Sequence, residues 1–168
     1  MLGDAASPTP FGPQEALMTT AASTMPFKRI LVPVDGSDHG FHAARTAARL
    51  ARAFDAKLTL LTVYDAPSAA LGEPNYSAAL SQALDHARGL IDEARQAVRD
   101  AGGPEPEVEW LGGSPADTII EVAKDGGYDL IVMGTHGRGR LTAALLGSVS
   151  NAVAARAGRP VLVVGDGR

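Results

Sequence analysis

Residues Lys28 to Ser37 read Lys-Arg-Ile-Leu-Val-Pro-Val-Asp-Gly-Ser and give the first evidence of the fold. Residues 30–34 are all apolar and do not alternate with polar ones, a pattern typical of a strand buried on both faces. Asp35-Gly36-Ser37 has the composition of a turn that ends such a strand. Apolar residues at helical spacing follow over 41–54. The stretch therefore predicts a buried strand, a tight turn and an amphipathic helix.

The same alternation continues along the rest of the chain. Further apolar runs predict strands at 57–63, 108–111, 129–133 and 160–164, and amphipathic segments between them predict helices over 80–98, from 115 towards 124, and over 148–157. Strands that alternate with helices form parallel sheets with right-handed crossovers and helices on both faces. The sequence therefore predicts an α/β protein with an open, doubly wound, five-stranded parallel sheet. Such sheets bind ligands beyond the carboxyl ends of the strands.

Composition excludes several classes of function. The chain has 168 residues, 45% of them hydrophobic, no cysteine, and a formal net charge of −4. Disulfides, thiolate metal sites and cysteine nucleophiles are excluded, and the acidic balance disfavours a nucleic-acid-binding protein. The four histidines lack metal-ligand spacing. No apolar run approaches the roughly 18 residues of a membrane span.

Residues 1–26 differ in composition from the remainder. They contain no Lys or Arg and are rich in Ala, Ser, Thr and Pro without a hydrophobic period. A secretory signal would need a basic start followed by an apolar stretch. We therefore expect a disordered N-terminal tail over 1–26, a folded domain over 27–166, and a cytoplasmic protein.

The segment with the most chemical information is Gly134 to Ser150. It carries Gly134, then Gly137 after two residues, then Gly147-Ser148 after nine more. Glycines just after a strand let the backbone approach an anion, and Gly147-Ser148 stands where the next helix begins, so free N–H groups face that anion. Arg138 and Arg140 add two cations. The combination predicts a triphosphate-binding site.

Two familiar glycine motifs do not fit this segment. Gly134-x4-Gly139 mimics the start of a Walker P-loop, but Arg140-Leu141 replaces the Lys-[Ser/Thr] of that motif. A dinucleotide fingerprint would follow the first strand, not the fourth. The alternative that stays open is a surface loop followed by an ordinary helix start.

Three parts of the sequence together resemble the ATP-binding branch of the universal stress protein family. They are the glycine pattern just described, the opening Ile-Leu-Val-Pro-Val-Asp-Gly-Ser at 30–37, and the closing Arg-Pro-Val-Leu-Val-Val at 159–164. The resemblance covers Phe27 to Gly165. It implies a Rossmann-like, adenine-nucleotide-binding sheet of strand order 3-2-1-4-5, a homodimer, and ATP as the ligand.

The resemblance also implies which residues contact the nucleotide. Residues matching Pro33, Val34 and Asp35 meet adenine and ribose, and Val63 and Met133 line the adenine slot. Ribose and phosphates are surrounded by residues of the glycine-rich segment, namely Gly134, His136, Gly137, Arg138, Gly147, Ser148, Val149 and Ser150.

Three of these residues have a second interpretation. Asp35 stands in a composition that also makes ordinary turns. Ser148 is expected to be a helix cap as well as a phosphate ligand. His136 either stabilises phosphate charge or is a solvated loop histidine.

The sequence favours binding over catalysis. After Met133 no carboxylate follows until Asp166, and no general base stands out beside the glycines. Asp35 is the candidate to hold Mg²⁺ together with the phosphates, since this ion keeps several waters and takes few protein ligands. We therefore expect ATP binding with Mg²⁺ and at most slow hydrolysis. The alternative is a non-catalytic dimeric interaction module that binds no ATP or a different nucleotide.

The last predicted strand indicates a homodimer independently. Val161 to Val164 are consecutive apolar residues at an expected sheet edge, an exposure that single-chain proteins usually avoid. Pairing that edge with a second copy across a two-fold axis would cover it.

Overall fold

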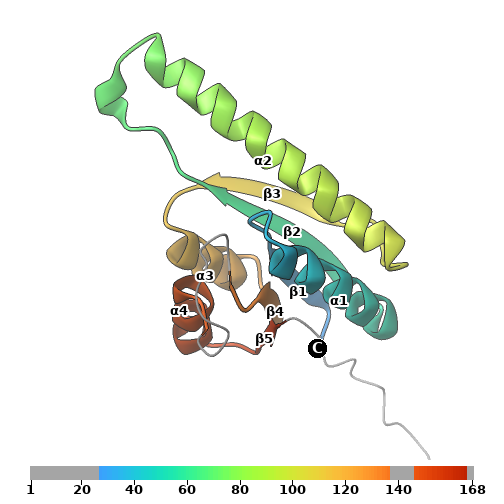
Figure 1. Ribbon diagram of the computed structural model, residues 1–168. Helices are drawn as coiled ribbons and strands as arrows, with labels where there is room; N and C mark the ends of the chain where they lie inside the picture. The colour runs from blue at the N-terminus through green and yellow to red at the C-terminus, as the bar shows by residue number, and fades with distance from the viewer. Residues whose placement is uncertain (1–26, 137–145, 166–168) are drawn as a thin grey trace, which may run out of the picture.

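A five-stranded parallel sheet forms the centre of the protein (Figure 1). The computed structural model describes residues 27–136 and 146–165; the expected tail therefore lies outside the described residues. The strands lie in the order β3-β2-β1-β4-β5, which confirms the predicted sheet. Their bounds are β1 Arg29–Pro33, β2 Lys57–Tyr64, β3 Glu107–Gly112, β4 Leu130–Gly134 and β5 Val161–Val164. Because the order reverses between β1 and β4, the carboxyl ends of these strands form the crevice where such sheets bind ligands.

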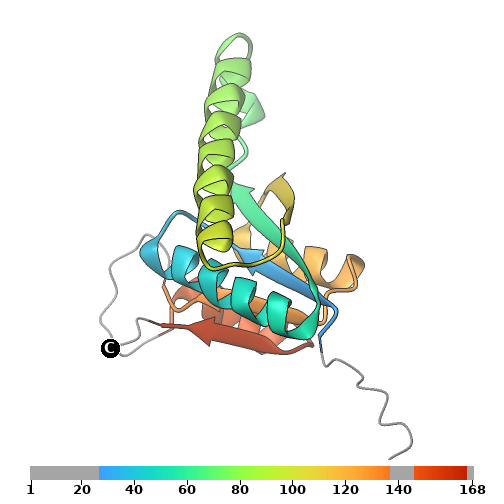
Figure 2. The ribbon, with the colours of Figure 1, turned by 90° about the vertical axis from the view of Figure 1, so that its right-hand side faces the viewer.

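Helices cover both faces of the sheet (Figures 1 and 2). The helices α1 (Asp38–Phe54) and α2 (Asn75–Asp100) pack on one face, and α3 (Pro115–Asp125) and α4 (Ser148–Arg156) on the other. A short 3-10 helix, η2 (Ala69–Leu71), lies in the connection from β2 to α2. The helix α2 begins at Asn75, five residues before the apolar stripe at 80–98 that predicted it. Its first turn is mostly polar or small, so the sequence shows little apolar period there. Among the described residues, no helix is long and apolar enough to cross a membrane.

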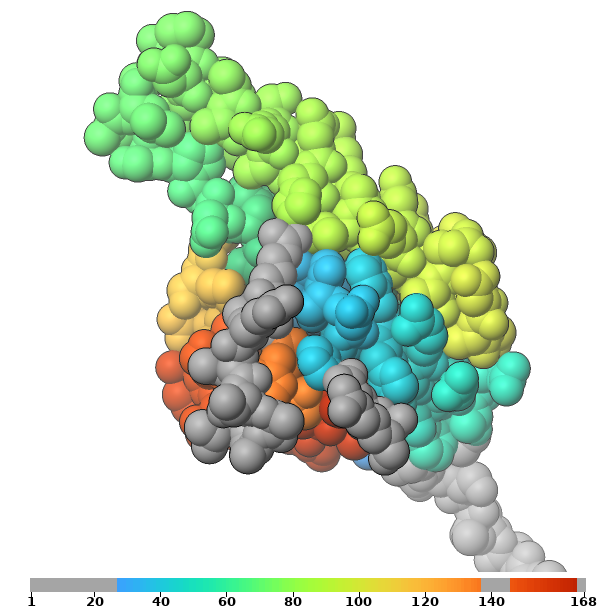
Figure 3. All heavy atoms as spheres, viewed as in Figure 1, coloured from blue at the N-terminus to red at the C-terminus, as the bar shows by residue number. Residues whose placement is uncertain are grey.

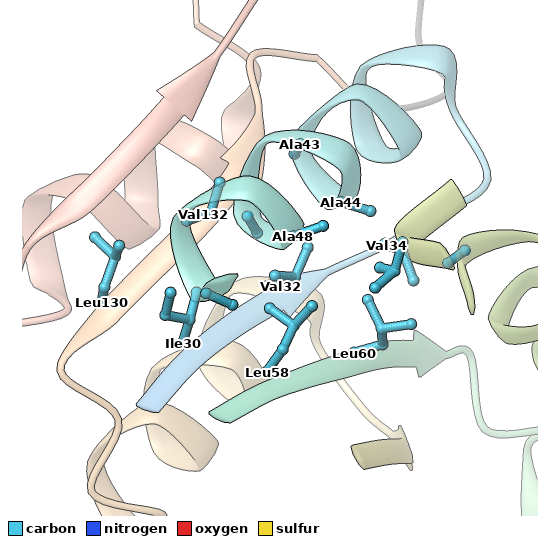
Figure 4. Packing of buried hydrophobic residues seen from close by; sticks show 14 of the residues in the cluster. Ile30, Val32, Val34, Ala43, Ala44, Ala48, Leu58, Leu60, Leu130 and Val132 are labelled. Carbon is cyan, nitrogen blue, oxygen red and sulfur yellow. The ribbon is translucent and has the colours of Figure 1, made fainter. Parts of the chain in front are cut away.

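Side chains of residues 30–34, in β1 and just after it, alternate between two hydrophobic cores. Ile30, Val32 and Val34 pack under α1 (Figure 4), whereas Leu31 points to the α3 and α4 side. The face of α1 toward the sheet consists of small residues: Gly40, Ala43, Ala44, Ala47, Ala48 and Ala51. Small side chains let this helix approach the sheet closely, and this approach places its first turn against the end of β4.

Tyr128 closes the core at the amino end of β4. It is 2% exposed, its hydroxyl donates to Glu109 Oε1 at 3.2 Å, and the Arg29 guanidinium lies 4.9 Å from the ring centroid. Burial raises the pKa of the Tyr128 phenol above its ordinary value, and the negative charge of Glu109 raises that pKa further. The native state therefore favours the neutral phenol.

This raised pKa predicts a loss of stability in alkali. The contribution is fully present below the unfolded-state pKa of about 10 and is lost as pH rises through the higher native-state pKa. We expect the free energy of unfolding of wild type, measured by urea denaturation, to fall more steeply above pH ~10 than that of Tyr128→Phe. At neutral pH the variant loses about 1 kcal/mol with its hydrogen bond. Tyr76→Phe, which leaves this cluster intact, is the control; equal alkaline slopes for Tyr128→Phe and wild type would contradict the assignment.

Candidate functional site

A cavity of about 300 Å³ opens at the carboxyl ends of β1, β2 and β4. This volume lies in the range of about 300–1,000 Å³ found for small-molecule sites. The cavity lies on the sheet face that α3 and α4 cover, since Leu61 and Met133, which point to that face, line it. Its position at the β1 and β4 ends is the crevice expected for this sheet topology.

The cavity has an apolar part and a polar part. Side chains of β1, β2, β4 and the first turns of α3 form the apolar part: Pro33, Val34, Leu61, Val63, Pro115, Ile119 and Met133. The β1–α1 turn, the end of β4 and the start of α4 form the polar part: Asp35, Gly40, Gly134, His136, Gly147, Ser148, Val149 and Ser150. An apolar ring fits the first part, and a hydroxylated or anionic group fits the second.

The turn between β1 and α1 fixes the Asp35 carboxylate at the cavity. Asp35 Oδ1 accepts from the Ser37 amide at 3.1 Å and from Ser37 Oγ at 2.6 Å. Ser37 is the N-cap of α1, and its hydroxyl oxygen accepts from the Gly40 amide at 3.1 Å. Gly36 supplies the turn with φ 79. The carboxylate organises the turn, as the first interpretation has it, and Asp35 also lines the cavity. Ligand contact by Asp35 stays a prediction.

The end of β4 and the start of α4 are joined at one carbonyl. The Thr135 oxygen accepts from the Gly147 amide at 2.7 Å and from Ser150 Oγ at 2.9 Å. Ser150 is 2% exposed, and its hydroxyl also lies 3.0 Å from the Gly147 oxygen. These bonds hold the two glycine positions, 134 and 147, at one rim. They make the Ser150 hydroxyl a positioning group for the helix start.

The first turn of α4 presents backbone donors to the cavity. Gly147, not Ser148, is the N-cap, so the expectation of a Ser148 cap is wrong. The first intrahelical bond of the turn runs from the Asn151 amide to the Gly147 oxygen at 2.9 Å. The amides of Ser148, Val149 and Ser150 therefore have no intrahelical acceptor. Together with the positive end of the helix dipole, they suit an anion.

Two histidines meet beside the polar part. The rings of His39, in the first turn of α1, and His136 lie 5.6 Å apart between centroids. His39 Nδ1 lies 3.4 Å from Thr135 Oγ1. His136 Nε2 is buried and has no hydrogen-bond partner among the residues that the structure describes. His136 also lines the cavity.

Packing of α1 against the end of β4 leaves no room for a side chain at position 134. A Cβ at this position would lie 2.8 Å from the carbonyl carbon and from Cβ of His39. The first turn of α1 therefore occupies the place of a side chain at 134. This is a different physical reason for the glycine from the close approach of an anion that the sequence suggests.

The helices α3 and α4 are tied together beside the cavity. Asp117, in the first turn of α3, pairs with Arg156, in the last turn of α4. The Arg156 guanidinium holds the pKa of the Asp117 carboxyl below its usual value, and a hydrogen bond from Ser114 lowers that pKa further. Ser114 is the N-cap of α3 but makes no side-chain bond to the helix amides. This exposed pair adds to the apolar contacts, such as those of Ile119 and Val153 in one core, that hold the two helices together.

The structure brings most of the predicted site residues together. Eleven of them line the cavity: Pro33, Val34, Asp35, Val63, Met133, Gly134, His136, Gly147, Ser148, Val149 and Ser150. Gly137 and Arg138 lie outside the described residues. The sequence reasoning missed Gly40, Leu61, Pro115 and Ile119. Leu61 was accessible to that reasoning, because it alternates with Val63 along β2 and shares its face.

Metal ligands are few in this part of the chain. Among residues 27–136 and 146–165, no group of three or more His, Asp or Glu side chains gathers. Asp35 is the one carboxylate among the described lining residues. A cation here would take Asp35 together with ligand oxygens and water.

Comparison with known proteins identifies the family. The family model described as "Universal stress protein family" matches residues 26–165. The chain belongs to the universal stress protein family. A universal stress protein of Thermus aquaticus is 40% identical over 138 residues, which cover 82% of this chain and 98% of that protein. One from Methanocaldococcus jannaschii is 36% identical over 139 residues, covering 82% of each chain.

Solved structures of universal stress proteins share the fold. Universal stress protein UspA from Lactobacillus plantarum superposes with a TM-score of 0.73 at 32% identity, covering 82% of this chain and 97% of that chain. A universal stress protein solved in complex with cAMP superposes with a TM-score of 0.62 at 29% identity, covering 83% and 97%.

Proposed function

We propose that this universal stress protein is a cytoplasmic protein that forms homodimers and binds ATP in the cavity at the β1 and β4 ends. The observation that carries the proposal is the division of the cavity into an apolar part and a polar part with helix amides at its end. Adenine would occupy the apolar part, beside Val63 and Met133. The phosphates would lie on the amides of Ser148, Val149 and Ser150. The similar structure solved with cAMP supports an adenine nucleotide as the ligand class.

The same residues fit Mg²⁺ bound together with the phosphates. Asp35 would supply a carboxylate oxygen, and waters and phosphate oxygens would complete the octahedron. We propose at most slow hydrolysis, because Asp35 is the one carboxylate among the described lining residues and would be engaged by Mg²⁺. A general base must instead accept a proton from the attacking water. Phosphate release after prolonged incubation with MgATP measures this turnover.

We propose that the homodimer forms through β5. This strand ends the sheet, and Leu162 is 38% exposed while Val161, Val163 and Val164 are half-buried. Pairing of two β5 edges across a two-fold axis would satisfy the free backbone groups and cover Leu162. Sedimentation velocity of the full chain at micromolar concentration is expected to give at least a dimer; a monomer would refute this pairing.

A thermal melt of the full chain with and without MgATP tests nucleotide binding. At 100 times its dissociation constant a ligand adds about 2.7 kcal/mol of stability. For a chain of this size that corresponds to a rise in Tm of roughly 5–10 °C. GTP at the same concentration is the specificity control, and cAMP tests the alternative adenine nucleotide. No rise with any of them, and no nucleotide released from the purified protein by denaturation, would favour an interaction module that binds no nucleotide.

A further inference from the structure

The first half of α2 and the connection leading into it project from the body of the protein. We call residues 65–86 the arm; it contains η2 and the first three turns of α2. Figures 1, 2 and 3 show the arm, in green, extending past the sheet and clear of the other helices. None of its residues is buried, whereas Ala87, the next residue along α2, is 1% exposed.

The arm carries an apolar face that has no sheet beneath it. The buried face of α2 consists of Ala87, Leu90, Ile91, Ala94, Ala97 and Val98. The same face continues into the arm as Tyr76, Leu80 and Leu84, at steps of one helical turn. Leu71 of η2, which packs against α2, is 48% exposed. Tyr76, Leu80 and Leu84 are half-buried, and Leu71 beside the helix is exposed, so the arm presents a partly exposed apolar face. Apolar surface of this kind marks an interaction site.

We propose that the apolar face of the arm binds the same face of a second copy, with the two arms antiparallel about a two-fold axis near Leu80. Tyr76 and Leu84 are equally distant from Leu80 in sequence. This arrangement therefore places Tyr76 against the partner's Leu84, and Leu84 against the partner's Tyr76. All three apolar side chains of the helical stripe are covered at once.

The charges of the arm favour a second copy as the partner and an antiparallel orientation of the two arms. Glu73 precedes the helix, and Arg88 follows the arm, where it pairs with Asp85 at 3.5 Å. Glu73 and Arg88 lie at nearly equal distances on either side of Leu80, so the antiparallel pairing brings each Arg88 near the partner's Glu73. A parallel pairing would oppose Glu73 to Glu73 and Asp85 to Asp85, which like-charge repulsion disfavours.

The arm lies away from the sheet edge formed by β5. The arm leaves the sheet from β2, whereas β5 forms the edge beyond β1 and β4. The two pairings use different surfaces, so a chain can make both, and the assembly then exceeds a dimer.

Sedimentation velocity of four full-length proteins separates the two pairings. We expect a mass above the dimer for wild type, a dimer for Leu80→Glu, a dimer for Leu162→Lys, and a monomer for the double variant. Gln82→Glu places the same charge on an exposed position away from the stripe and is expected to keep the wild-type mass. A wild-type mass for Leu80→Glu overturns the arm pairing. A wild-type mass for Leu162→Lys overturns the β5 pairing and leaves the arm pairing to be decided by Leu80→Glu.

Disulfide cross-linking tests the register of the two paired arms without adding a charge to the apolar face. The chain contains no cysteine, so Leu80→Cys can form a disulfide only between copies. Copper–phenanthroline would oxidise the two thiols at the two-fold axis, with loss of two protons and two electrons to the oxidant. We expect a covalent dimer on a non-reducing gel for Leu80→Cys and none for Gln82→Cys. Equal cross-linking of the two variants, or none of Leu80→Cys, contradicts the proposed axis.

Discussion

Replacement of Ser148 by Asp is expected to weaken ATP binding by about 100-fold while leaving the protein without ligand at least as stable as wild type. Ser148 is the first residue of α4, and its side chain is exposed at the cavity. A carboxylate at a helix N-terminus interacts favourably with the dipole, by about 0.3–1 kcal/mol. The same carboxylate repels a phosphate: two unit charges 4 Å apart interact by about 4 kcal/mol at an effective dielectric constant of 20. Solvent and counterions screen this repulsion to less than about 4 kcal/mol. Since each ~1.4 kcal/mol is a factor of ten in affinity, a loss of about 100-fold is expected.

The opposite signs of the two effects make the Ser148→Asp variant informative. Calorimetric titration with MgATP gives the affinity, and thermal melting without ligand gives the stability. Ser148→Asn is the control of nearly equal size without the charge, and it is expected to bind within a few-fold of wild type, because the backbone donors remain. Unchanged affinity in Ser148→Asp would place the phosphates elsewhere.

Gly134→Ala is expected to lower both stability and nucleotide affinity. The added Cβ would lie 2.8 Å from the carbonyl carbon of His39, and backbone atoms yield less readily than a flexible side-chain end. Overpacking of this kind costs about 1–3 kcal/mol of unfolding free energy. Relief requires the first turn of α1 to move away from β4. That turn contains Gly40, which lines the cavity, and begins at Ser37, which holds Asp35, so the polar part of the cavity is displaced with it.

Gly89→Ala is the matched control for this substitution. Gly89 lies within α2, and a Cβ there would meet nothing within 4 Å. The same chemical change is therefore expected to stabilise the protein by up to about 1 kcal/mol, through helix propensity alone. Urea denaturation compares the two variants with wild type. If Gly134→Ala is as stable as Gly89→Ala, α1 does not pack against β4 as described.

Local sequence patterns predicted the strands well because each strand is a run buried on both faces. The run at 30–34 has no polar interruption, and β1 covers Arg29–Pro33. The strand order came from the family resemblance, because no local pattern encodes which strands are neighbours. The start of α2 at Asn75 was missed, since small and polar residues in its first turn weaken the period.

The site was predictable where its residues stand in one motif and not where the fold assembles them. The glycine pattern indicated Gly134 and Gly147, which the Thr135 carbonyl holds at one rim. Pro115 and Ile119 line the same cavity only because α3 packs against β2 and α4, a placement set by long-range contacts. The close approach of His39 to Gly134 is likewise a product of packing, and sequence reasoning assigned that glycine to ligand contact alone.

The amide resonances of the ¹⁵N-labelled full chain, recorded during titration with MgATP, locate the nucleotide site. We expect the largest shifts at Asp35, at His136 and at the amides of residues 148–150, with the arm unaffected at constant oligomeric state. These residues come from the β1–α1 turn, the end of β4 and the start of α4, which converge at the one cavity. Absence of shifts at saturating MgATP, or shifts centred away from these residues, would contradict a nucleotide site at the β1 and β4 ends.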